Sequence, residues 1–81
     1  MKMTLKKENN VGIIVFEGGK IDNLEVYELK EMLDSLITQI SPKMGIIIDL
    51  GNIEYMDSSG LGFLLIINAR LKKIGSEIVF A

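Results

Sequence analysis

The spacing of apolar residues predicts two helices. Between Leu24 and Ile40 the apolar residues recur at intervals of three and four, which is the spacing of one face of an amphipathic helix. Asp22 or Asn23 would cap the start of this helix. A second helix is expected over Gly60–Lys73, because basic residues occupy its last turns and complement the negative end of the helix dipole. Gly75 is its predicted C-cap.

Four further segments have the residue types of β-strands. Thr4–Glu8 and the β-branched segment Val11–Glu17 flank a turn signal at Asn9–Asn10, which predicts a hairpin. Met44–Leu50 is almost continuously apolar, as in a parallel strand covered on both faces. Ser76–Phe80 is the last short strand. The resulting order, ββαβαβ, predicts an α/β fold with a mixed β-sheet, parallel inner strands and packed helices.

Length and residue types then narrow the possible functions. With 81 residues the chain can form one domain, residues 1–81. The absence of cysteine and histidine excludes disulfides, thiol nucleophiles, zinc sites built on these residues and catalysis by an imidazole base. We therefore expect no enzyme, no metal site and no cofactor.

Charge and hydropathy bear on the class of partner and on the cellular location of the protein. Nine basic and eleven acidic residues give a net charge of −2, and the basic residues are scattered, so we expect no nucleic-acid partner. The apolar runs are far shorter than the roughly 20 residues that cross a bilayer. Met1–Asn10 lacks the apolar core of a signal peptide. We therefore expect a cytoplasmic protein without membrane insertion.

The segment Tyr55–Gly62 carries the candidate chemistry. It lies between the buried strand and the second helix, where sites concentrate in α/β sheets. Asp57 and Ser58 are both natural N-cap residues, and a phosphate beside a helix N-terminus is electrostatically favoured. Gly60 and Gly62 keep the turn free of side chains, so that another protein's backbone or a phosphate can approach. On local chemistry alone, the favoured interpretation of this segment is a structural one, a helix cap followed by a tight turn.

Three blocks of this sequence resemble the STAS domain family, the anti-sigma-factor antagonists of bacteria. The Asp-Ser-Ser-Gly-Leu-Gly sequence at residues 57–62 resembles the phosphorylation motif of that family, and Ile46–Met56 is similar to the strand that leads to it. Gly19–Asp22 resembles the turn before the first helix of the family, and Arg70–Val79 the end of the second helix with the next strand. The resemblance covers residues 11–80.

The resemblance implies a regulatory switch at Ser58. In the family, the first serine after the aspartate is phosphorylated. The implied function is that of an antagonist that binds an anti-sigma factor while unphosphorylated and thereby frees a sigma factor. The anti-sigma factor is itself a serine kinase that switches the antagonist off, and a serine phosphatase restores it. Partner contacts are predicted at Asp22, Met56, Asp57, Ser59, Gly60 and Leu61. Asp22 is equally well explained as a helix cap alone.

Other interpretations stay open. The chain could be a STAS subunit that docks permanently onto a transporter or a lipid-transport ATPase without a phosphorylation cycle. An enzyme that uses Ser58 as nucleophile is disfavoured because no histidine is present to activate it. The run Leu61–Ile67 is apolar around almost the whole helix, so its residues belong either to the core or to a partner surface.

The resemblance also implies that the domain is incomplete. Family members continue past the last predicted strand with a helix, a short strand and a C-terminal helix, and this sequence has no such portion. An uncovered strand edge and apolar helix face favour self-association. We therefore expect a homodimer or an exchange of elements between two copies.

Overall fold

A four-stranded sheet forms one layer of the computed structural model, which describes residues 1–81. The strands β1 (Lys2–Glu8), β2 (Val11–Glu17), β4 (Gly45–Asp49) and β6 (Ile78–Phe80) are arranged in the order β1-β2-β4-β6. β1 is antiparallel to β2, whereas β4 is parallel to both of its neighbours. The prediction of a mixed sheet with parallel inner strands is therefore confirmed.

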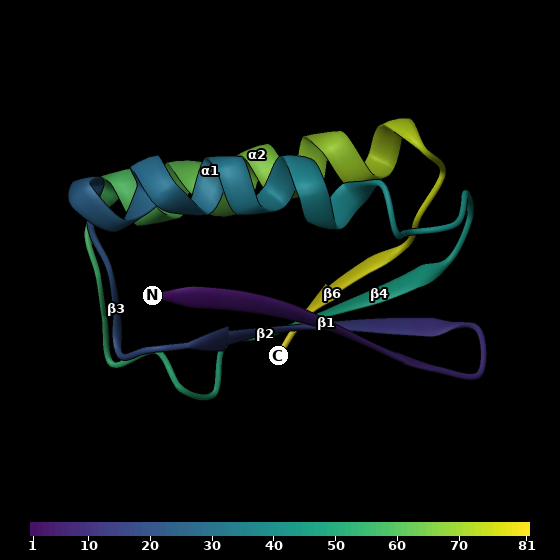
Figure 1. The fold of residues 1–81 in the computed structure, drawn as a ribbon, viewed down its shortest axis with the longest axis horizontal. Coiled ribbons are helices and arrows are strands. Elements are labelled where there is room, and N and C mark those ends of the chain that lie inside the picture. Colours follow the sequence, from purple (N-terminus) through teal and green to yellow (C-terminus); the bar gives the residue numbers. More distant parts are fainter.

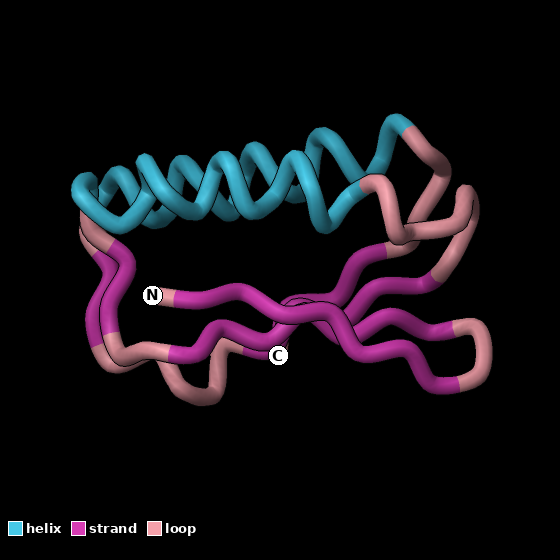
Figure 2. Tube along the Cα trace, in the orientation of Figure 1, coloured by secondary structure: helices cyan, strands magenta, loops and turns pink.

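The helices α1 (Asn23–Ile37) and α2 (Ser58–Lys73) form the second layer, on one face of the sheet (Figures 1 and 2). The expectation that the central strand is covered on both faces is wrong. In β4, burial alternates, with Ile46 and Ile48 buried and Ile47 only partly so. The crossovers β2-α1-β4 and β4-α2-β6 advance in the same direction, and right-handed connections of this kind place both helices on one face.

Buried side chains from both layers form a single core. The sheet contributes Ile14, Phe16, Ile46 and Ile48, each at most 2% exposed. The helices contribute the residues Leu29, Leu33, Phe63, Ile67 and Leu71, also at most 1% exposed. Burial of side chains of this size stabilises the fold by roughly 1.5–3 kcal/mol each, which fixes both helices firmly on the sheet.

Several predicted boundaries shift in the structure. β1 begins at Lys2 instead of Thr4, and α2 begins at Ser58 instead of Gly60. α1 ends at Ile37, although the apolar spacing continues to Ile40, because the last residues form tight turns with hydrogen bonds to the third residue before them. Ile40 nevertheless stays in the core at 6% exposure.

Two short strands were not predicted. β3 (Lys20–Ile21) and β5 (Tyr55–Met56) pair in parallel as a separate two-stranded sheet. Two residues are too few to show the alternation by which strands are recognised. Neither helix of the fold has the length and hydropathy needed to cross a membrane.

Candidate functional site

The pairing of β3 with β5 brings the starts of the two helices together. Ile21 is in register with Met56, and each of these residues is followed directly by the N-cap of a helix, Asp22 for α1 and Asp57 for α2. Both helices therefore begin at the same end of the molecule (Figure 1). Two segments that lie 35 positions apart in the chain thus form one continuous surface, with an aspartate from each.

Asp57 fixes the start of α2. Its backbone is extended, and its carboxylate accepts a hydrogen bond from the Gly60 amide at 3.1 Å. Its own amide donates to the Ile21 carbonyl oxygen at 3.3 Å. Of the two predicted caps, Asp57 takes this role, so Ser58 becomes the first residue of the helix. The Ser58 side chain is exposed and takes no part in the hydrogen bonds of the chain.

Asp22 has the same role for α1. Its carboxylate accepts hydrogen bonds from the amides of Leu24 at 3.2 Å and Glu25 at 3.0 Å, and Lys20 Nζ lies 3.5 Å away. The Glu25 hydrogen bond and the Lys20 charge hold the pKa of Asp22 below its ordinary value, although desolvation acts in the opposite direction. The capping interpretation of Asp22 is therefore confirmed, and its contact with a partner stays a prediction.

The two glycines of the motif face different surroundings. Gly60 is buried, and a Cβ atom on it would lie 2.5 Å from Met56 Cγ and 2.6 Å from the Ile21 carbonyl oxygen. The prediction that another molecule approaches closely at Gly60 is wrong, because β3 and β5 of the same chain already fill this space. Gly62 is different, because a Cβ atom there would meet nothing within 4 Å. Only Gly62 leaves room that another molecule can use.

The apolar run of α2 divides between core and surface. Phe63, Leu64 and Ile67 are buried, whereas Leu61 is 58% exposed and Leu65 is 69% exposed. The core interpretation is therefore confirmed for the buried residues, and a partner surface stays a prediction for the exposed ones.

The remaining predicted contacts surround Ser58. Leu61 is exposed one turn after it, and Ser59 and Met56 are half-buried beside it. Tyr55, in β5, is also exposed.

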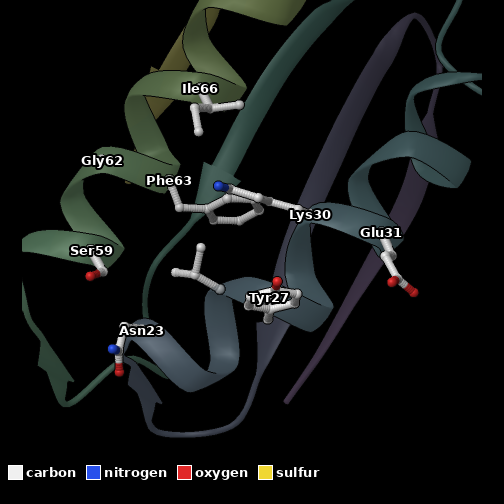
Figure 3. Close-up of a pocket in the computed structure, with 9 residues that line it drawn as sticks. Asn23, Tyr27, Lys30, Glu31, Ser59, Gly62, Phe63 and Ile66 are labelled. Carbon is white, nitrogen blue, oxygen red and sulfur yellow. The ribbon is translucent and has the colours of Figure 1, made fainter.

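A groove of about 660 Å³ runs between the first halves of the two helices (Figure 3). We call it the α1-α2 groove. Val26 and Phe63 form the floor of this groove. Its sides are formed by residues of both helices, namely Asn23, Tyr27, Lys30 and Glu31 of α1 and Ser59, Gly62 and Ile66 of α2.

The α1 side of this groove was not predicted from the sequence. The available signal was Tyr27, an aromatic residue beside the apolar face of the first predicted helix instead of on it, and 80% exposed in the fold. Aromatic residues on protein surfaces are enriched at interfaces.

The chemistry of the site suits modification and binding. No three acidic side chains are grouped so that they could hold a metal ion. Ser58 has no hydrogen-bonded base that would activate its hydroxyl as a nucleophile. Its hydroxyl is open to solvent at a helix N-terminus, where the dipole carries about half a positive charge.

Comparison with known proteins is consistent across sequence and structure. The STAS domain family model matches residues 2–81. The anti-sigma-B factor antagonist of Listeria monocytogenes is 30% identical over 79 residues, which are 98% of this chain and 68% of that protein.

Solved structures show the same fold. An anti-sigma factor antagonist from Mycobacterium paratuberculosis superimposes with a TM-score of 0.73 at 22% identity, over 98% of this chain and 66% of that one. The anti-sigma factor antagonist SpoIIAA of Bacillus, at 21% identity, gives TM-scores of 0.69 in its unphosphorylated form and 0.67 in its phosphorylated form. These matches cover 98% and 96% of this chain, and 71% and 69% of those chains. The chain belongs to the STAS domain family.

Proposed function

We propose that this chain is an anti-sigma-factor antagonist that is switched off by phosphorylation of Ser58. The observation that carries the proposal is the position of Ser58, exposed on the first turn of α2 beside the caps of both helices. Relatives named as anti-sigma factor antagonists support it. In the unmodified state, the surface around Ser58 binds an anti-sigma factor and so releases the sigma factor that it holds.

The anti-sigma factor is proposed to act as the kinase. The Ser58 hydroxyl oxygen attacks the γ-phosphorus of ATP, the bond between the β- and γ-phosphates breaks, and ADP leaves while the hydroxyl proton passes to a base of the kinase. A serine phosphatase later hydrolyses the phosphoserine. Because this chain supplies only the acceptor, it is a regulatory substrate and not an enzyme.

Charge explains how the modification would end binding. A phosphoserine carries about −1.5 to −2 charges at pH 7, and at residue 58 it would stand next to the Asp57 carboxylate, with Asp22 at the cap of the neighbouring helix α1. The helix dipole offsets only about half a charge. The surface therefore becomes strongly negative and bulky, and it repels a closely fitting partner. No rearrangement of the fold is required, because the Ser58 side chain makes no hydrogen bond that would have to break.

Binding measurements with purified proteins test the proposal. The anti-sigma factor of the source organism is titrated calorimetrically with wild type, Ser58→Ala and Ser58→Asp. We expect wild type and Ser58→Ala to bind, and Ser58→Asp to lose most of its affinity. Ser41→Asp is the matched control, since Ser41 is also exposed but lies in the connection between α1 and β4. Equal binding by wild type and Ser58→Asp would contradict the switch and favour permanent docking onto a transport complex.

A further inference from the structure

We propose that the α1-α2 groove binds a segment of the anti-sigma factor that inserts an apolar side chain and places a carboxylate against Lys30. This inference rests on the proposed function and adds the chemistry of the partner. It is carried by three features of the groove, namely its apolar floor, the unexplained glycine in α2 and the position of Lys30 (Figure 3).

The floor of the groove is apolar and already ordered. Val26 is 8% exposed and Phe63 only 1%, so the partner would meet side chains fixed by the core. Ile66 at 37% exposure and Tyr27 at 80% stand at the sides. Partly exposed apolar side chains around a concave floor suit an inserted apolar residue of another protein. The groove lacks the convergent buried polar groups that a small-molecule site uses to orient its ligand.

Gly62 has no packing role in this chain. It lies inside α2, where a glycine is less favourable than an alanine, and a Cβ atom on it would meet nothing within 4 Å. Its missing side chain instead widens the groove that it lines. A glycine of this kind is explained by the close approach of another molecule's backbone.

Lys30 gives the groove its charge preference. The three ion pairs of the fold involve Lys20, Arg70 and the amino terminus, so Lys30 has no carboxylate partner. Figure 3 shows the Lys30 side chain extending toward Phe63, while Glu31 turns away from the ring. A free ammonium beside an apolar floor is complementary to a carboxylate on the occupant.

An acidic occupant also connects the groove to Ser58. Ser59 lines the groove and directly follows Ser58 in α2. Phosphate on Ser58 would therefore add negative charge one residue away from the lining of the groove. Repulsion between these charges would drive the partner away, so the charge of the occupant explains why this position can act as the switch.

The test uses the purified anti-sigma factor and calorimetric titration of wild type, Ser58→Asp, Lys30→Glu and Gly62→Ala. We expect Lys30→Glu to weaken binding at least about 10-fold, because it replaces attraction by repulsion. Gly62→Ala should weaken binding several-fold while raising the melting temperature, so loss of folding cannot explain its effect. Lys72→Glu is the matched control, because this exposed lysine lies in the last turn of α2, outside the groove; its affinity should equal that of wild type.

The outcomes separate this inference from the proposed function. If wild type binds and Ser58→Asp does not, but Lys30→Glu and Gly62→Ala bind like wild type, the groove assignment is overturned and the switch stands. If Lys72→Glu weakens binding as much as Lys30→Glu, the attraction is a general charge effect and the groove assignment is again overturned. If wild type binds no anti-sigma factor, both proposals fail together.

Discussion

Gly60 packs directly against the backbone of Ile21, so closely that a Cβ atom on residue 60 would lie 2.6 Å from the Ile21 carbonyl oxygen. The same oxygen accepts the hydrogen bond from the Asp57 amide. The first turn of α2 is therefore attached to β3 at two points. Since β3 leads into the cap of α1, this contact holds the starts of both helices, including Ser58 as the first residue of α2, in a fixed arrangement.

This contact predicts opposite effects for the two glycines of the motif. Gly60→Ala forces a side chain against a backbone atom that cannot move freely, and we expect a loss of about 1–3 kcal/mol in the free energy of unfolding. Gly62→Ala meets no atom and should raise it by up to about 1 kcal/mol. Urea denaturation followed by circular dichroism measures both. Equal stability of the two variants would show that the packing at Gly60 is not restrictive.

The cap of α1 predicts a loss of stability in acid. The pKa of Asp22 is lower in the folded chain than its ordinary value. As pH falls, the carboxyl group is therefore protonated at a higher pH in the unfolded chain than in the folded chain. The stability that this carboxylate contributes is present above its ordinary pKa of about 4 and is lost as pH falls through the lowered value. Asp22→Asn keeps a capping oxygen but cannot ionise.

Melting temperatures of wild type and Asp22→Asn, measured between neutral pH and pH 2, test this assignment. The difference between them should shrink as the solution becomes more acidic, because all other carboxylates titrate in both proteins. Parallel curves would mean that Asp22 does not contribute through its charge.

The amino terminus predicts a matching effect in alkali. The Met1 amino group lies 2.9 Å from Glu25 Oε2, and the hydrogen bond with Glu25 raises the pKa of this amino group, although burial opposes the shift. Its contribution to stability is present in full below its ordinary pKa of about 8 and is lost as pH rises through the raised value. Glu25→Gln should therefore lower the melting temperature at pH 7 and have less effect at higher pH. An unchanged difference across this range would argue against the ion pair.

Phosphorylation is predicted to leave the fold intact. Ser58 is exposed and its neighbour Asp57 keeps the cap of α2, so an added phosphate breaks no hydrogen bond of the fold. We expect amide chemical shifts to change around Ser58 and at the adjoining helix starts, but not in β1, β2 or β4. A two-dimensional NMR comparison of the two forms measures this, and shifts throughout the sheet would contradict a purely local effect.

The sequence was sufficient for the main elements because long periodic segments carry their own signal. The helix around Leu29 and Leu33 and the strand around Ile46–Ile48 were predicted for this reason. The coverage of β4 on both faces was wrongly inferred, since a run of apolar residues does not reveal on which face each crossover lies. The face on which a crossover helix lies is set by the right-handed rule together with the order of the strands in the sheet.

Two parts of the site depend on tertiary structure and could not be predicted. The β3-β5 pairing joins Ile21 to Met56 across the whole first helix, without any local pattern of its own. The α1-α2 groove brings Lys30 beside Phe63 only because the helices pack in parallel on one face. The different roles of Gly60 and Gly62 likewise depend on β3, which lies against only one of them.

Site-specific analysis of phosphorylation tests the central claim most directly. The wild-type chain is incubated with the purified anti-sigma factor and ATP, and its mass and the modified residue are determined by mass spectrometry, with Ser58→Ala and Ser59→Ala treated identically. We predict one phosphate on wild type and on Ser59→Ala, located on Ser58, and none on Ser58→Ala. Phosphate on Ser59, or on Ser58→Ala, or no phosphate on a wild-type chain that binds the anti-sigma factor, would contradict a switch at Ser58.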